Sequence, residues 1–273
     1  MSNGKPISCN YHCHTKRCGH AIGEDEEYVK EAIAGHYDVL GFSDHVILDH
    51  HKQEGMRGDF SLLPGYVHSI KSLAAKYKDD IEIHLGFEAE WFYEEYRSYY
   101  EKLLSDGLVQ YFILGQHCFL TDDDRFFWYC AMADRDLATR KYTEDLLSGM
   151  RSGLYRYVAH PDLFASWNEG WTDTCEESAR KIISLAKDLK MPLEINMGPA
   201  TREQRDFVNS NLNHFYPNSR FWDLVAEAGA KAIIGVDAHI PGLLRSAPFD
   251  WVRDFAKKRG IEVIERLDLP LLV

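Results

Sequence analysis

Histidines and carboxylates gather at the ends of apolar, β-branched stretches along this 273-residue chain. Six of the thirteen histidines close such a stretch, and a seventh lies in the loop after the first stretch. These ligand candidates are His12, His14, His45, His117, His160, His239 and the loop residue His20, together with the carboxylates Glu88 and Asp237. Imidazole and carboxylate ligands together suit Zn²⁺, Mn²⁺ or Fe, so the pattern predicts a metal centre rather than a structural cysteine-type zinc site.

The spacing within these groups places pairs of ligands on one side of the backbone. Alternate residues of a strand face the same way, so His12 and His14 are expected to point together. Asp237 and His239 repeat this geometry, and Glu88 could bridge two ions from the end of the third stretch. A single HxH or DxH pair commonly occurs without binding a metal. The ordered set HxH, DH, E, H, HPD and DxH, in contrast, predicts a metal site.

Seven strand-like stretches, alternating with helical spacing, are expected to position these ligands. The predicted strands are 7–14, 38–45, 81–91, 111–118, 155–161, 192–198 and 231–239. The predicted helices are 25–35, 66–77, 137–151, 174–189, 221–229 and 251–259, with a capping box from Asp173 to Glu176. Repeated strand–helix units predict a parallel sheet. Their number, and the absence of a dinucleotide-binding glycine pattern after the first strand, favour barrel-like closure over a doubly wound sheet.

Length and composition are typical of one globular unit, and residues 1–273 are expected to form a single domain. No signal peptide or membrane span is predicted, and six cysteines without a CxxC pair favour a reduced, cytoplasmic setting. The net charge of −12 argues against a nucleic-acid partner, which would require basic patches. Bound divalent cations would nevertheless allow an acidic chain to accept a phosphate group.

The segments HCHTKRCGH, GFSDH, GFEAE, LGQH, AHPDL and GVDAH resemble, in order and spacing, the polymerase and histidinol phosphatase (PHP) superfamily. The resemblance covers nearly the whole chain and implies an α/β fold, a distorted seven-stranded (β/α)7 TIM-like barrel with three divalent metal ions at its mouth. The resemblance assigns His12, His14, Glu88 and Asp237 to the first ion, His20, His45 and His239 to the second, and Glu88, His117 and His160 to the third.

Within this superfamily the chain is most similar to the monofunctional histidinol-phosphate phosphatases. SGLYRYVAHPDLF resembles their fifth-strand segment, and EINMG followed by an arginine and YPNSRFW resembles their substrate loop. The loop departs from the family pattern in the spacing between Asn196 and Arg202 and in having no lysine after that arginine. Arg202 is the expected phosphate-binding residue, and Arg205 and Arg220 are the alternatives.

The resemblance implies a phosphoric monoester hydrolase of histidine biosynthesis that converts a small phosphorylated metabolite, L-histidinol phosphate. Two close divalent ions would lower the pKa of a bridging water, and the resulting hydroxide would attack phosphorus. Glu88 would bridge the ions, while Asp44, Asp237 or a metal-bound water could protonate the leaving group. Asp44 equally suits a structural role, because it should face away from His45. The alternatives are a phosphatase of another metabolite, a phosphodiesterase or nuclease, and an inactive metal-binding regulatory protein.

Overall fold

Seven parallel strands form the central sheet in the computed structural model, which describes residues 9–198 and 216–272. The strands follow the order β1-β2-β3-β4-β7-β8-β9, and every neighbouring pair is parallel. Their bounds are β1 Cys9–Asn10, β2 Val39–His45, β3 Glu82–Ala89, β4 Tyr111–Leu114, β7 Tyr155–Val158, β8 Leu193–Asn196 and β9 Ala232–Gly235. Parallel pairing throughout is the arrangement that alternating strand and helix units require.

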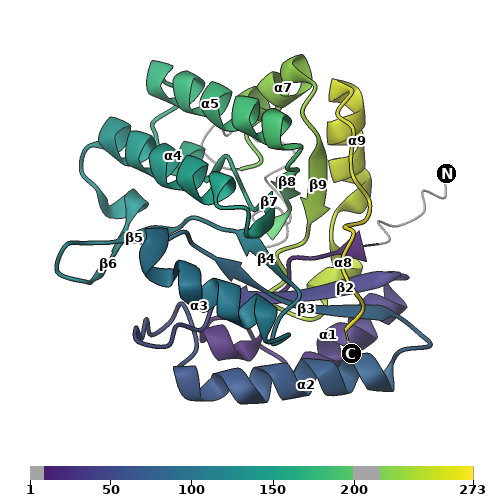
Figure 1. The fold of residues 1–273 in the computed structure, drawn as a ribbon. Helices are drawn as coiled ribbons and strands as arrows, with labels where there is room; N and C mark the ends of the chain where they lie inside the picture. The colour runs from purple at the N-terminus through teal and green to yellow at the C-terminus, as the bar shows by residue number, and fades with distance from the viewer. Residues whose placement is uncertain (1–8, 199–215, 273) are drawn as a thin grey trace.

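The two edges of this sheet meet and nearly close it into a barrel. An isolated parallel bridge joins Cys13 to Ala238, and the His14 amide donates to the Ala238 carbonyl at 2.9 Å. The side-chain oxygen of Asn10 accepts a hydrogen bond from the Val236 amide at 2.9 Å. The fold is therefore an α/β TIM-like barrel, and the predicted fold class is confirmed (Figure 1).

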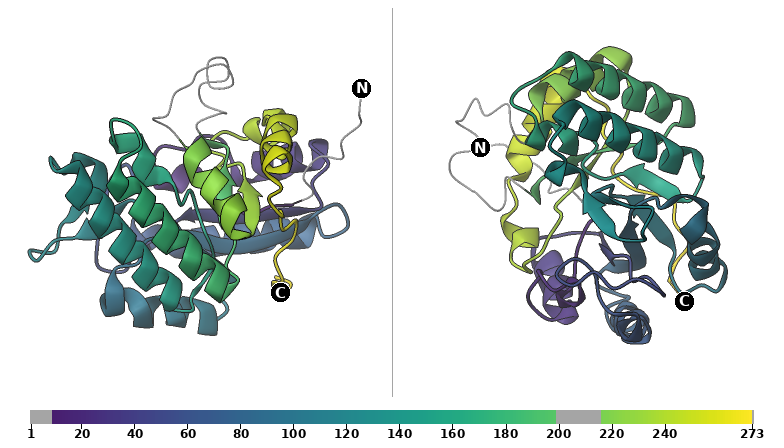
Figure 2. Two further views of the ribbon diagram at one scale, coloured as in Figure 1. Left: turned by 90° about the horizontal axis from the view of Figure 1, so that it is seen from above. Right: turned by 90° about the vertical axis from the view of Figure 1, so that its left-hand side faces the viewer.

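Helices surround the barrel on its outer side (Figures 1 and 2). They are α1 Asp25–Ala34, α2 Leu63–Lys76, α3 Tyr93–Ser105, α4 Arg135–Arg151, α5 Asp173–Leu189, α7 Ser219–Ala228, α8 Leu243–Ser246 and α9 Phe249–Arg259. Short 3₁₀ turns occur at η1 Lys16–Cys18, η2 Phe60–Leu62, η3 Tyr129–Ala131 and η4 Leu163–Trp167. Among the described residues, no helix combines the length and the apolar character that crossing a bilayer requires.

Strand alternation divides the apolar side chains into an outer and an inner layer. In β3, Leu85 and Phe87 belong to the large cluster between the strands and the helices. Tyr11, Tyr111 and Tyr157 belong to a smaller cluster inside the barrel. The barrel is thus filled rather than hollow, as expected for a parallel barrel.

The chain after α9 crosses the N-terminal end of the barrel. The Ile264 amide donates to the carbonyl of Ala232, the first residue of β9, at 2.7 Å. The Leu267 amide donates to the Tyr11 hydroxyl at 3.1 Å, and Leu267 packs against the inner cluster. This segment therefore covers the N-terminal end of the barrel. A parallel barrel places its functional groups at the other end, where the strands have their C-termini.

Six of the seven strands end earlier than predicted, whereas β2 ends at His45 as predicted. Strand β9 ends at Gly235 rather than at residue 239, and β4 ends at Leu114 rather than at residue 118. The backbone of Asp237 has φ 53° and that of His160 has φ 30°, which strand geometry does not allow. The residues that were predicted to close the strands therefore lie mostly in the loops just beyond them.

Three elements and one cap also differ from the prediction. Helices α3 and α8 and the antiparallel hairpin of β5 Cys118–Leu120 and β6 Phe126–Trp128 are absent from the predicted elements. The predicted capping box at Asp173 is wrong by one residue: the N-cap is Thr172, whose hydroxyl accepts from the Cys175 amide at 3.2 Å. The other five helices lie where the apolar spacing predicts them, within a few residues at each end.

Candidate metal centre

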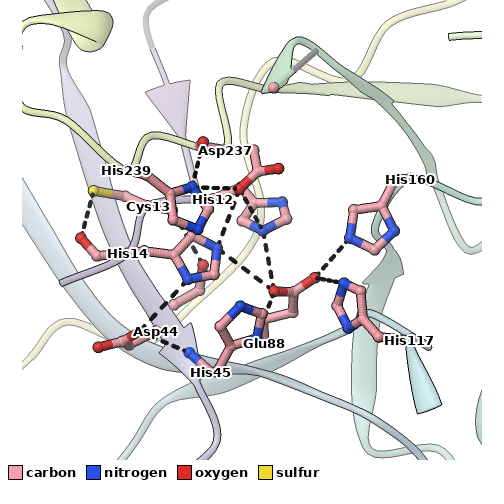
Figure 3. Close-up of polar contacts among 12 residues, drawn as sticks. His12, Cys13, His14, Asp44, His45, Glu88, His117, His160, Asp237 and His239 are labelled. Carbon is pink, nitrogen blue, oxygen red and sulfur yellow. Dashed lines mark hydrogen bonds and ion pairs between the residues drawn. The ribbon is translucent and has the colours of Figure 1, made fainter. Parts of the chain in front are cut away.

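The nine predicted ligands converge at the C-terminal mouth of the barrel, where Figure 3 shows eight of them. Only His45 and Glu88 lie within strands, while the others follow the ends of β1, β4, β7 and β9 or lie in the next loop. A cavity of about 190 Å³ opens here. Its lining consists of His14, His20, His45, Met56, Glu88, His117, Trp128, His160, Tyr216, Asp237 and His239.

Glu88 lies at the middle of the cluster, between two groups of imidazoles (Figure 3). Its Oε2 is 3.1 Å from Nδ1 of His45 and 3.5 Å from Nε2 of His12. Its Oε1 is 2.7 Å from Nε2 of His160 and 3.5 Å from Nε2 of His117. Nε2 of His14 also lies 3.5 Å from Oε2, so each carboxylate oxygen faces a different group of histidines, which is the arrangement that a bridging ligand needs.

Asp237 supplies a second carboxylate on the other side of the cluster. Its Oδ1 is 3.2 Å from Nε2 of His14, 3.3 Å from Nδ1 of His239 and 3.6 Å from Nε2 of His12. A positive φ at a residue other than glycine costs about 1–3 kcal/mol and persists where the surroundings enforce it. The structure around Asp237 therefore holds its backbone in this conformation, in which the carboxylate contacts the three histidines.

Two buried carboxylates behind the cluster were not among the predicted site residues. Glu194, within β8, accepts from Nδ1 of His12 at 2.9 Å. Glu90 lies 3.1 Å from Nδ1 of His117 and accepts from the Arg57 guanidinium at 3.0 Å. A carboxylate on one ring nitrogen fixes the ring orientation and leaves the other nitrogen available to a metal. Glu90 could have been predicted from the amino-acid sequence, because it follows Glu88 by two residues and so shares a face of the predicted strand with it.

The Asp44 side chain points away from the cavity, toward Thr15 and the His45 backbone. The Thr15 hydroxyl donates to its Oδ2, and the His45 amide donates to its Oδ1 at 2.9 Å. Nδ1 of His14 lies 3.5 Å from the same Oδ1. Asp44 therefore contacts the segments that carry two of the predicted ligands and does not line the cavity.

Several buried ring nitrogens face carboxylates without forming hydrogen bonds to them, which makes this cluster suitable for cations. Nε2 of His12, Nε2 of His14 and Nδ1 of His45 are buried and form no hydrogen bond. Burial raises the pKa of Glu88, but the imidazoles of His117, His12 and His45 outweigh this effect and hold the pKa well below its ordinary value. An ionised carboxylate beside nitrogen lone pairs is a donor set that suits transition metals, so the residues fit the predicted ions.

Comparison with known proteins agrees with this geometry. Residues 10–198 match the model of the PHP domain. The chain belongs to the PHP family. It is 26% identical over 265 residues to a "Probable histidinol-phosphatase" of Deinococcus radiodurans, and the match covers 94% of this chain and 96% of the relative.

The PHP fold is also evident from a solved structure. The histidinol phosphate phosphatase of Lactococcus lactis, crystallised with zinc, L-histidinol and phosphate, has a TM-score of 0.68. It is 20% identical in sequence, and the match covers 95% of each chain. At this level of identity the likeness establishes the shared barrel, while the chemistry of this PHP chain has to be argued from its own residues.

Of the three arginines predicted as phosphate-binding residues, only Arg220 lies within the described part of the chain, and it does not line the cavity. The Arg220 guanidinium, on α7, binds Glu176 at 3.0 Å and 2.8 Å. Arg202 and Arg205 lie outside the described residues. Among the residues that the structure describes, no arginine or lysine lines this cavity, so its walls carry imidazoles, carboxylates and three apolar or aromatic side chains.

Proposed function

We propose that this protein, a metal-dependent phosphatase of the PHP family, hydrolyses L-histidinol phosphate to L-histidinol and phosphate. The observation that carries the proposal is the cluster of nine predicted histidine and carboxylate ligands, eight of which line a single cavity. The name of the Deinococcus relative, which matches almost the whole chain, supports the choice of substrate. A small phosphorylated metabolite is thus the proposed partner, and a cytoplasmic location stays a prediction.

Three ions are proposed, distributed as the family pattern implies. The first would be held by His12, His14, Glu88 and Asp237, the second by His20, His45 and His239, and the third by Glu88, His117 and His160. When bound, such ions activate water near neutral pH and neutralise charge on the phosphoryl oxygens. Zinc, manganese and iron all suit these ligands.

The surrounding residues hold the ligands in their working orientation. Glu194 accepts from Nδ1 of His12, which leaves Nε2 directed at the carboxylates of Glu88 and Asp237. Glu90 has the same relation to His117. We assign Asp44 a positioning role, because its oxygens are directed at Thr15 and at the backbone rather than into the cavity. Burial raises the pKa of Asp237, but the imidazoles of His12 and His239 outweigh this effect and hold the pKa well below its ordinary value. Asp237 is therefore ionised, and a metal-bound water is the proposed proton donor to the leaving group.

The apolar wall of the cavity suits the organic part of the substrate. Trp128, Tyr216 and Met56 line the cavity beside the ligands. Aromatic side chains pack well against a flat ring such as imidazole. The substrate also carries a primary ammonium, and a chain with a net charge of −12 presents a favourable field to that cation.

The purified protein is expected to contain transition metal, up to three ions per chain. The nine ligands face one another with anionic carboxylates between the imidazoles, so a cluster without metal would leave buried polar atoms uncompensated. Elemental analysis after growth with manganese, iron and zinc measures the content. Less than one ion per chain would contradict the proposed function.

Histidinol phosphate is expected to be hydrolysed with a higher kcat/KM than simple phosphate monoesters, and Arg202→Ala is expected to lower that value on the order of 30- to 150-fold. The reason is the loss of a charge-assisted contact to phosphate of ~2–3 kcal/mol. Arg205→Ala and Arg220→Ala test the two alternative residues in the same phosphate-release assay. If nucleotides or diesters are the better substrates, the substrate assignment is wrong and the metal chemistry can still hold.

A further inference from the structure

Cys18 is buried for a different reason from the other buried cysteines. Four of them belong to the two hydrophobic clusters, and these are Cys9, Cys13, Cys118 and Cys175. Cys18 is only 1% exposed, yet it belongs to neither cluster of the described residues. Its neighbours Lys16 and Gly19 are exposed. Apolar packing therefore does not account for the burial of this thiol.

A short, well-defined turn brings Cys18 to the mouth of the barrel. The η1 turn begins after Thr15, and the Cys18 amide donates to the Thr15 carbonyl at 3.2 Å. Gly19 ends the turn with φ 86°, a left-handed conformation that glycine adopts without strain. The Ile22 amide then donates to the His239 carbonyl at 2.9 Å, which ties this loop to the segment after β9.

The side chain of Cys18 lies among ligand atoms that already surround the cavity. Its sulfur, a ring nitrogen of His20 and a ring nitrogen of His239 all lie within 4.8 Å of one another. Its sulfur also lies within 4.8 Å of a ring nitrogen of His14 and a carboxylate oxygen of Asp44. Both ring nitrogens of His14 are buried without a hydrogen bond. This is a mixed cluster of sulfur and nitrogen donors, which is the ligand chemistry of soft divalent ions.

We propose that Cys18 is a thiolate ligand of the ion held by His20 and His239, and that it makes this position selective for zinc over manganese. Thiolate ligands favour zinc, whereas carboxylate and water ligands suit manganese. In tetrahedral geometry, zinc–sulfur and zinc–nitrogen bonds of about 2.3 Å and 2.1 Å place the two ligand atoms ~3.6 Å apart, so atoms that lie within 4.8 Å of one another need to move by on the order of 1 Å. The inference rests on the proposed metal centre and does not depend on which phosphate ester is the substrate.

Cobalt substitution tests this ligand directly, because a thiolate bound to Co²⁺ gives an intense near-ultraviolet charge-transfer band that imidazole and carboxylate ligands do not give. Metal-free protein would be titrated with Co²⁺ as wild type, as Cys18→Ser and as Cys118→Ser. Cys118 is the matched control, because it is equally buried and follows the predicted ligand His117, but packs in the outer hydrophobic cluster. We expect the band in wild type and in Cys118→Ser, and its loss in Cys18→Ser with the visible cobalt bands retained.

The remaining outcomes distinguish a failure of the Cys18 assignment from a failure of the proposed metal centre. The Cys18 assignment alone would be overturned if wild type showed visible cobalt bands without a thiolate band. It would also be overturned if the thiolate band survived in Cys18→Ser. Failure of wild type to bind cobalt or zinc would overturn the metal centre together with it. If Cys18→Ser does not fold, zinc-edge X-ray absorption of the wild type decides, since a sulfur neighbour at about 2.3 Å is required. In competition titrations, Cys18→Ser is expected to lower the zinc-to-manganese affinity ratio on the order of tenfold or more.

Discussion

Replacing Glu88 with glutamine is expected to lower the rate of phosphate release on the order of 100-fold or more, with a much smaller effect on folding stability. Glutamine keeps the shape of the side chain but removes its negative charge. In the wild type, that charge lies between His45 and His12 on one side and His160 and His117 on the other. A neutral amide cannot bridge two cations in the same way, so the catalytic ions lose their shared ligand.

The measurement compares kcat for histidinol phosphate with the melting temperature of metal-loaded protein. Glu82→Gln provides the matched control, because Glu82 begins the same strand and pairs with Arg266 at the far end of the barrel. This control is expected to retain wild-type turnover. Wild-type turnover in Glu88→Gln with a full complement of metal would show that Glu88 is not a bridging ligand.

The convergence of the ligands was predictable because a parallel barrel gathers its C-terminal strand ends at one face. The nine residues end or follow six of the seven strands, so the topology alone brings them together. What local spacing cannot supply is the pairing across the barrel. His12 and Glu194 are 182 residues apart in the chain, and their hydrogen bond exists only because β8 and the segment after β1 face each other in the closed sheet.

Helix α3 was missed although its burial follows a helical pattern. Tyr96, Tyr100 and Leu103 are buried at spacings of four and three residues, which is one face of a helix. The segment begins without a side-chain cap at Phe92, and aromatic residues favour strands over helices. Its start therefore lacked the local signal that the Asp134 cap provides for α4.

Gly115→Ala is expected to reduce metal content and to lower kcat/KM on the order of 100-fold, because the site has no room for a methyl group. A Cβ atom at this position would lie 2.0 Å from Oε1 of Glu88 and 2.5 Å from its Cγ and Cδ. The clash involves the stem of the side chain as well as its tip, so the whole carboxylate must move away from His160 and His117. Overpacking of this kind also costs about 1–3 kcal/mol of stability.

Two further variants separate this local effect from a general loss of stability. Gly65 lies in α2 with no heavy atom within 4 Å of an added Cβ, so Gly65→Ala should keep full activity and gain up to ~1 kcal/mol from the higher helix propensity of alanine. Gly115→Ala combined with Glu88→Ala should melt at a higher temperature than the sum of the two single effects predicts, since alanine at position 88 has none of the three atoms that clash. Wild-type metal content and activity in Gly115→Ala would mean that Glu88 can move without loss, and that its observed position between the two histidine pairs is not required for catalysis.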